Sequence, residues 1–519
     1  MNVNRFLDAA ADRISAGDPA AIAMSFGGRN RLTYHQLRDK SLRYAAALRA
    51  LGLTRGDRLG LMLFNDVEYL PLYFAAMRLG VITVRINFRL APAELEFILA
   101  DSGCRAVIVH GSLAEKVEPI RDATGVRTFI VKPDTPDSIP LWAEAFEILE
   151  DRDPIDATAS IAPDDPIALI YTSGTTGRPK GAVWTHRNTV GTATMQALRW
   201  QFSQRTVALV PGPLYHGGGF EAVLAPALLM GGRAVYMESG NFSVDRLLEV
   251  IREERVTDCL VFSFMFNDLL RYDDLEDRLS DSLEHIIIGG DTMMPWVVGE
   301  LRRRLPRVRL TQVYGLTEGG AVATTLEDEF FDSQPKSVGR PLPLAEVKVV
   351  DETGAEIGIG EEGEIWVRSP GVCAGYWQRP EANRETFSGG WCRTGDLGYV
   401  NADGFLVLAG RAKDMIRSGG ENVYPAEIEK VLTGFPGIGD AAVIGVPDST
   451  YNEVGCAVIV RAGDAVPDPD ELRTLCRSAL ASYKIPKYFV YREELPRNAS
   501  GKVLKYLLRA EYEKLEKEM

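Results

Sequence analysis

The feature that most restricts the fold is a long alternation of short apolar runs with segments of helical periodicity. Strand-like apolar runs occupy Arg58–Leu63, Val81–Ile86 and Ala106–His110. Between them, apolar residues recur at helical spacing over Val67–Leu79 and Pro92–Ala100. Further strands are predicted at Ile167–Tyr171, Val207–Val210, Ala234–Met237, Cys259–Phe262, Ile286–Ile288 and Leu310–Tyr314. This alternation predicts an α/β fold built of doubly wound α/β layers.

The pattern changes after about residue 340. Short strand-like runs such as Glu346–Val350 and Phe405–Leu408 are separated by Gly, Asp and Asn turns, which is typical of a small β-rich subdomain. Beyond this stretch, helical and strand-like segments alternate again. We therefore expect an N-terminal domain over residues 1–410, with the β-rich subdomain at about 340–410, and an α+β C-terminal domain over residues 411–519.

Composition excludes several classes of function. The 58 Lys and Arg against 72 Asp and Glu give a net charge of −14, which argues against general nucleic-acid binding because phosphate backbones require clustered cations. No window reaches the roughly 18 consecutive apolar residues of a membrane span, and the N-terminus lacks a signal-peptide core. The six scattered cysteines form no C-x-x-C pair. We expect reduced thiols in a cytoplasmic protein without a membrane span.

The most informative motif is Ile170–Gly181, which reads I-Y-T-S-G-T-T-G-R-P-K-G and follows a predicted strand. Glycines let backbone N–H groups approach anionic oxygens, hydroxyls add donors, and a lysine adds a mobile positive charge. The pattern is not a Walker A loop, and its alternative interpretation is a polar surface turn. The predicted phosphate-binding residues are Thr172, Ser173, Gly174, Thr175, Thr176, Gly177 and Lys180.

This order of residues resembles the phosphate-binding loop of the adenylate-forming superfamily, which includes acyl-CoA synthetases, peptide-synthetase adenylation domains and luciferases. The resemblance extends over nearly the whole chain. It implies ATP and Mg²⁺ as cofactors, and it implies that the C-terminal domain is mobile.

A second similarity lies at Tyr314–Glu318, which reads Y-G-L-T-E. By resemblance, Thr317 contacts the AMP phosphate and Glu318 holds Mg²⁺, for which a carboxylate is a suitable hard ligand. Just upstream, the segment Ile288–Asp291 resembles the one that lies along the adenine ring. The further nucleotide-binding residues implied here are Gly289, Gly290, Asp291, Tyr314 and Gly315.

A third similarity covers Trp391–Asp396 and Gly410–Asp414. In relatives the aspartate corresponding to Asp396 accepts both ribose hydroxyls, which suits a carboxylate with two acceptor oxygens, and Arg411 adds a ribose contact. Lys413 stands at the position that resembles the hinge of the family.

The segment Pro496–Lys502 resembles the family's catalytic-lysine loop. The resemblance implies that Lys502 bridges the substrate carboxylate and the nucleotide during adenylation, and that the C-terminal domain then rotates. Gly419 and Gly420 would afterwards line a tunnel for the pantetheine arm of coenzyme A. An ordinary turn is the alternative for these two glycines.

The acyl-binding segment is predicted at Pro213–Phe220, where three glycines follow His216. By resemblance, His216 gates the acyl site or binds the carboxylate, although a packing or capping histidine stays open. The glycines either leave space for a bulky acid or serve only to start the helix expected at Phe220–Met230. The absence of an F-D-x-S pattern argues against amino acids as substrates.

These motifs predict an acid–thiol ligase that activates a fatty, aryl or alicyclic acid as acyl-AMP, releases pyrophosphate and forms a thioester with coenzyme A. The alternatives are an adenylation enzyme that loads a carrier protein, a catalytically silent binding protein and, more remotely, a luciferase-like oxygenase. The presence of Lys180, Glu318, Asp396 and Lys502 argues against a silent protein. The sequence leaves open which acid is used and whether the chain forms a homodimer.

Overall fold

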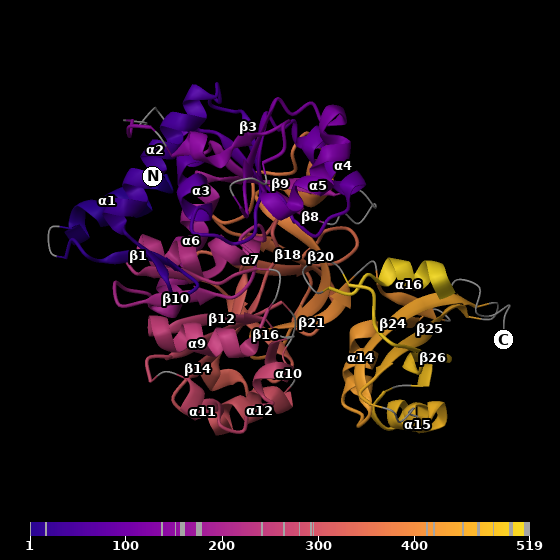
Figure 1. Cartoon of the computed structure of the whole chain (residues 1–519). Helices are drawn as coiled ribbons and strands as arrows, with labels where there is room; N and C mark the ends of the chain where they lie inside the picture. Colours follow the sequence, from indigo (N-terminus) through magenta and orange to yellow (C-terminus); the bar gives the residue numbers. More distant parts are fainter. Residues whose placement is uncertain are drawn as a thin grey trace. The chain divides into compact units, whose positions relative to one another are not determined.

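The computed structural model describes residues 2–15, 18–135, 139–150, 152–155, 161–172, 179–239, 242–262, 265–279, 281–290, 293, 295–411, 414–418, 421–448, 451–463, 468–480, 482–497 and 502–512. The chain divides into two compact units (Figure 1). Unit 1 comprises residues 1–347 and 366–394, and unit 2 comprises residues 348–365 and 395–519.

The first sheet of unit 1 has seven strands in the order β7-β6-β5-β3-β4-β8-β9. Neighbouring strands are parallel except for β9, which runs antiparallel to β8. The strands are β3 (Arg58–Met62), β4 (Ile82–Arg85), β5 (Ala106–His110), β6 (Thr128–Lys132), β7 (Glu144–Ala145), β8 (Pro166–Thr172) and β9 (Lys180–Thr185). Helices α3 (Tyr69–Leu79) and α4 (Pro92–Ser102) make the crossovers from β3 to β4 and from β4 to β5.

Both faces of this sheet are covered, as the sequence of β5 illustrates. Ala106 and Ile108 belong to the core shared with α3, whereas Val107 and Val109 belong to the core on the opposite face, where α4 packs. Alternate side chains of a strand point to opposite faces, so a strand buried on both sides must be apolar throughout. This requirement explains why the parallel strands could be recognised as continuous apolar runs.

The second sheet of unit 1 follows the order β16-β15-β14-β13-β12-β10-β11-β1-β2. It is parallel from β14 to β1, whereas β15, β16 and β2 pair antiparallel. Its strands are β1 (Ile22–Phe26), β2 (Asn30–Thr33), β10 (Val207–Val210), β11 (Arg233–Tyr236), β12 (Asp258–Phe262), β13 (His285–Gly289), β14 (Arg309–Tyr314), β15 (Thr324–Glu327) and β16 (Ser337–Pro341). The helices buried in the main core include α1 (Asn4–Ser15), α2 (Tyr34–Ala50), α6 (His186–Trp200) and α8 (Ala225–Leu229).

Four further strands pair in the order β17-β18-β20-β21. They are β17 (Glu346–Val350), β18 (Gly363–Arg368), β20 (Trp391–Val400) and β21 (Leu406–Arg411). In unit 2, the order of the other sheet is β23-β22-β25-β24, and β26 pairs with β25. Its strands are β22 (Ile416–Ser418), β23 (Glu421–Val423), β24 (Ile438–Asp448), β25 (Asn452–Arg461) and β26 (Tyr488–Arg492).

Helices cover both faces of the unit 2 sheet. Val443 of β24 packs in the core of α14 (Pro425–Thr433) and α15 (Pro469–Ala479), whereas the next residue, Ile444, packs with α16 (Lys505–Tyr512). The α/β fold class predicted from the alternation is confirmed, and β5 and β10 have the predicted bounds. Within the described part of the chain, none of the helices has both the length and the apolar character needed to cross a membrane. The six cysteines are buried free thiols.

The helix expected at Phe220–Met230 is present in a different form. A short α7 (Gly217–Gly219) leads into a π-helical turn, η4 (Phe220–Leu224), before α8 begins. A π-helical turn changes the direction in which the following side chains point, and such turns are often found at functional sites. Nothing in the apolar periodicity of this segment distinguishes a π-turn from an α-helix.

Candidate functional site

Two predicted motif residues stand opposite each other at the edge of the seven-stranded sheet. Thr172 ends β8, Lys180 begins β9, and the antiparallel register pairs them. Nine of the predicted residues lie outside the described residues: Ser173, Gly174, Thr175, Thr176, Gly177, Asp291, Lys413, Gly419 and Gly420. Their roles stay predictions.

Glu318 brings three separate parts of unit 1 together. The residue is 8% exposed, and its Oε1 accepts hydrogen bonds from Thr172 Oγ1 at 2.8 Å and from the Tyr376 hydroxyl at 2.9 Å. The ammonium group of Lys180 lies 5.2 Å from the centre of the Tyr376 ring. Two motifs that are far apart in sequence, Ile170–Gly181 and Tyr314–Glu318, therefore meet at one carboxylate.

Tyr376 was not predicted as a site residue. It lies in a segment that extends the first sheet by pairing with β9: Val183 N–H donates to the Gly375 carbonyl at 2.8 Å, and Trp377 N–H donates to the Gly181 carbonyl at 2.8 Å. Ala182 and Tyr376 are opposed in an antiparallel bridge. This is a long-range pairing, and no local signal in Gly375–Trp377 announces it.

A tight turn after β14 fixes the position of Glu318. Ala321 N–H donates to the Leu316 carbonyl at 3.0 Å, which closes the turn. A Cβ atom at Gly315 would lie 2.2 Å from the Ala321 carbonyl oxygen, so only glycine fits there. Tyr314, the residue before it, is the last residue of β14.

The same turn places Thr317 beside the predicted acyl segment. A Cβ atom at Gly217 would lie 3.5 Å from Thr317 Oγ1 and 3.9 Å from a methyl group of Ile170. His216 is thus next in sequence to the point where the acyl segment approaches the turn. The structure brings together Thr172, Lys180, Thr317, Glu318 and the segment that begins at His216.

His216 caps the turn that follows it. Its Nδ1 accepts a hydrogen bond from Gly218 N–H at 3.1 Å, which puts the proton of the neutral imidazole on Nε2. Burial and, to a smaller extent, the positive charge of Arg85 lower the pKa of His216 to about 4. The capping role left open by the sequence is confirmed, and Nε2–H is left as a neutral donor.

A fully buried ion pair supports this segment. Arg85 Nη2 donates to Glu221 Oε1 at 2.6 Å, Arg85 Nη1 donates to Oε2 at 2.9 Å, and neither side chain has any exposed surface. Arg85 Nη1 also donates to the carbonyl of Leu214 at 3.2 Å. Glu221 belongs to the π-turn η4, and Arg85 ends β4, so the pair joins the acyl segment to the first sheet.

The remaining nucleotide candidates of unit 1 follow β13. Gly289 ends that strand, and Gly290 has a positive φ of 100°, a conformation that favours glycine. In unit 2, Asp396 is buried within β20, and its Cα register partner is Arg411 of β21. The two residues predicted to contact ribose are therefore adjacent across a strand pair.

Lys502 lies in unit 2 directly before a closed loop end. Its neighbour Val503 bridges to Arg497, and Leu504 N–H donates to the Pro496 carbonyl at 2.7 Å. Arg497 is also ion-paired with Asp440. Lys502 itself is exposed and precedes α16.

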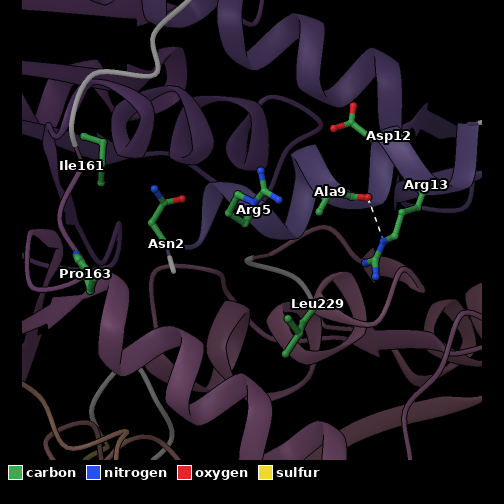
Figure 2. Close-up of a pocket in the computed structure, with 8 residues that line it drawn as sticks. All are labelled: Asn2, Arg5, Ala9, Asp12, Arg13, Ile161, Pro163 and Leu229. Carbon is green, nitrogen blue, oxygen red and sulfur yellow. Dashed lines mark hydrogen bonds between the residues drawn. The ribbon is translucent and has the colours of Figure 1, made fainter.

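A groove of about 770 Å³ lies elsewhere in unit 1, along helix α1 (Figure 2). It is lined by Asn2, Arg5, Ala9, Asp12, Arg13, Ile161, Pro163 and Leu229. None of these residues belongs to the predicted motifs, and the Arg13 guanidinium is tied to the Ala9 carbonyl at 3.1 Å. We therefore base the site on the Lys180–Glu318 cluster.

Comparison with known proteins agrees with this geometry. Residues 11–377 match the AMP-binding enzyme family, and residues 427–502 match the AMP-binding enzyme C-terminal domain. The chain belongs to the AMP-binding enzyme family. The predicted adenylate-forming resemblance is confirmed, and with it the prediction that the chain is an enzyme.

This AMP-binding enzyme has relatives of similar length. It is 35% identical over 486 residues, 93% of each chain, to the long-chain-fatty-acid–CoA ligase FadD13 of Mycobacterium tuberculosis. It is 33% identical over 505 residues, 95% of this chain and 93% of the relative, to the fatty acid–[acyl-carrier-protein] ligase ScoC of Streptomyces coeruleorubidus. The structure of o-succinylbenzoate CoA synthetase from Bacillus subtilis with its acyl-adenylate intermediate is 32% identical, covers 97% of this chain and 98% of its own, and superposes with a TM-score of 0.86.

The protonation of His216 is testable by NMR of the five labelled histidines. The resonance that disappears in the His216→Gln variant belongs to His216, and its pH titration in the unmodified protein should give a pKa of about 4. Because this pKa lies below the unfolded value of about 6.5, the neutral ring favours the fold fully above that value, and its contribution is lost as the pH falls towards the folded pKa. A resonance titrating near the unfolded value would contradict the buried, capping geometry.

The Arg85–Glu221 pair is testable by unfolding. Glu221→Gln leaves a buried guanidinium without its counter-charge, so we expect a loss of about 3 kcal/mol or more of stability and a lower midpoint of thermal unfolding. As a control, Asp164→Asn removes the exposed pair with Arg187 and should leave the midpoint nearly unchanged. Equal effects of the two substitutions would show that the buried pair is not a structural anchor.

Proposed function

We propose that this AMP-binding enzyme is an ATP-dependent acyl-CoA synthetase. It activates a hydrophobic carboxylic acid as acyl-AMP and transfers the acyl group to coenzyme A. The observation that carries the proposal is the meeting of Thr172, Lys180 and Glu318 in unit 1, because the first two residues and the third come from two separate motifs of an adenylate-forming family.

The residues present are suited to Mg²⁺ and a triphosphate. Both hydroxyl donors address Oε1 of Glu318, and no donor to Oε2 is found among the described residues. Mg²⁺ is commonly held by one or two carboxylates together with the substrate phosphates. Glu318 would hold the ion, which when bound screens the charge of the triphosphate, and Lys180 would contact the phosphates.

The first half-reaction joins the acid to AMP. A carboxylate oxygen of the acid attacks the α-phosphorus, and the bond from that phosphorus to the oxygen bridging to the β-phosphate breaks as pyrophosphate leaves. We assign Lys502 the task of guiding the two anions together, and Thr317 a contact with the α-phosphate. Asp396 and Arg411 would bind the ribose, and Tyr314, Gly315, Gly289 and Gly290 would border the adenine.

His216 supplies a neutral donor at the acyl side. Its Nδ1 is engaged by Gly218 N–H, so Nε2–H is available to hydrogen-bond an oxygen of the acyl carboxylate. A neutral imidazole at physiological pH donates without neutralising the attacking oxygen, which must keep its nucleophilic charge. We propose that His216 orients the carboxylate rather than transferring a proton.

The second half-reaction exchanges AMP for a thiol. The sulfur of coenzyme A attacks the acyl carbon, AMP leaves with the bridging oxygen, and the thiol proton is released. We propose that the C-terminal domain, residues 411–519, rotates about Lys413 between the two steps, and that Gly419 and Gly420 border the pantetheine arm.

The acid is proposed to be a fatty, aryl or alicyclic one. Relatives named for long-chain fatty acids and for o-succinylbenzoate support the fatty and aryl members of this range. The relative named for loading an acyl carrier protein supports a second candidate, an adenylation enzyme whose acceptor is a carrier protein.

The proposed function is tested by measuring pyrophosphate release with Mg·ATP over a panel of fatty, aromatic and alicyclic acids. At least one acid should release pyrophosphate, and coenzyme A should convert the product to a thioester. Thioester formation with a holo carrier protein instead of coenzyme A would favour the second candidate. No release of pyrophosphate with any acid would refute both.

Lys502→Ala is expected to abolish acyl-AMP formation and to leave thioester formation from supplied acyl-AMP largely intact. The reason is that the lysine is needed where two anions approach, a situation that arises only in the first step. The matched control is Lys505→Ala, three residues after Lys502, which removes the ion pair between Lys505 and Glu429. This variant should retain both steps. Equal loss of both steps in Lys502→Ala would contradict the assignment.

A further inference from the structure

We propose that Tyr376 is a positioning residue that fixes the Glu318 carboxylate and the Lys180 ammonium relative to each other. Both groups can then bind the same metal–triphosphate complex. This inference rests on the proposed function, because it gives Glu318 the metal and Lys180 the phosphates. Tyr376 contacts both side chains: its hydroxyl is 2.9 Å from Glu318 Oε1, and its ring centre is 5.2 Å from Lys180 Nζ.

The hydroxyl contact restricts the carboxylate. A carboxylate can only accept, so the Tyr376 hydroxyl is the donor, as is the hydroxyl of Thr172. Two donors on Oε1 restrict rotation of the carboxylate, and no donor to Oε2 is found among the described residues.

The backbone of Tyr376 is itself held rigidly. The side chain of Asn383 accepts from Tyr376 N–H at 2.6 Å and donates to the Tyr376 carbonyl at 3.1 Å. Gly375 has a positive φ of 118°, and a Cβ atom there would lie 3.0 Å from Asn383 Oδ1, so glycine allows this clamp to form. Phe387 packs edge-on against the Tyr376 ring at 5.5 Å. A side chain supported in this way can hold another in a fixed geometry.

A second set of one lysine, one tyrosine and one glutamate, here called the second trio, differs from the site in how its charges pair. Tyr44 donates to Glu68 Oε2 at 2.6 Å, and Lys40 Nζ lies 5.5 Å from the Tyr44 ring. In that trio Lys40 also pairs directly with Glu68 Oε1 at 2.6 Å, so the two charges neutralise each other. Among the described residues, Lys180 and Glu318 form no such pair.

The phenol ring at the site therefore contacts a cation and an anion that form no ion pair with each other among the described residues. Lys180 is attracted to the face of the ring, and Glu318 is attracted to its hydroxyl. Within the described part of the chain neither charge neutralises the other, which leaves both for a ligand that carries its own phosphates and cation. This arrangement suits a metal–nucleotide complex better than it suits a structural ion pair.

The experiment uses the full-length enzyme and a non-hydrolysable ATP analogue. Calorimetry measures the affinity for the analogue at free Mg²⁺ concentrations from very low to saturating. In Tyr376→Phe the ring remains and the hydroxyl is lost, so the Mg²⁺ concentration that gives half of the maximal gain in affinity should rise about 10-fold. The affinity for the metal-free analogue should stay unchanged, since Lys180 keeps its ring.

Two further variants separate the contacts. Thr172→Val removes the other donor to Oε1 and should shift the Mg²⁺ requirement in the same direction. Tyr376→Leu removes the ring as well, so it should also weaken binding of the metal-free analogue. Tyr44→Phe is the matched control: it removes a phenol–carboxylate bond of the second trio and should leave both quantities unchanged.

The outcomes are distinct. If Tyr376→Phe keeps the wild-type Mg²⁺ requirement, or shifts it no more than Tyr44→Phe does, the positioning role is overturned while the proposed function stands. If the wild-type enzyme binds no Mg·ATP analogue, the proposed function fails and the inference fails with it. The midpoint of thermal unfolding of each variant shows whether a loss of affinity is caused by unfolding. If Tyr376→Phe is unfolded, the Mg²⁺ requirement of Thr172→Val decides between these outcomes.

Discussion

The candidate site depends on one oxygen atom, Oε1 of Glu318. It accepts hydrogen bonds from the end of β8 through Thr172 and from the segment that extends the first sheet through Tyr376. Glu318 itself follows β14 of the second sheet. Because a buried carboxylate must be hydrogen-bonded, this single group draws elements of two sheets to one point. The hydrogen bonds to this carboxylate therefore position the residues proposed to bind the phosphates and the metal.

A buried ion pair has a similar structural role in the predicted acyl segment, where it also joins separate elements. Arg85 and Glu221 are removed from water completely, and such a pair adds little net stability compared with apolar residues of similar volume. Its effect is geometric, because the guanidinium also donates to the Leu214 carbonyl, two residues before His216. The pair thus fixes the shape of the acyl segment. Burial and, to a smaller extent, the charge of Arg85 lower the pKa of His216 and favour the neutral imidazole that the proposed carboxylate contact requires.

The sequence predicted those parts that depend on local pattern. Doubly buried strands such as β5 had to be apolar throughout. The family resemblance implied that Thr172 and Glu318 serve the same nucleotide, and their hydrogen bond is a finding of the structure. Tyr376 was missed because its contacts come from a strand pairing nearly two hundred residues apart in sequence. The Arg85–Glu221 pair and the π-turn were missed for a related reason: an apolar periodicity carries no information about a charged partner on another element.

The glycines after His216 illustrate how backbone requirements can imitate a binding feature. A Cβ atom at Gly219 would lie 2.7 Å from the Pro213 carbonyl oxygen, so this glycine is needed for the turn itself. Just before the segment, a Cβ atom at Gly212 would lie 2.6 Å from the Phe262 ring, which occupies the space there. Of the two explanations open from the sequence, the conformational one accounts for Gly219 without a bulky acid. Under the proposed function, selectivity for the acyl group is then expected from side chains near His216, such as Phe262, more than from the run of glycines.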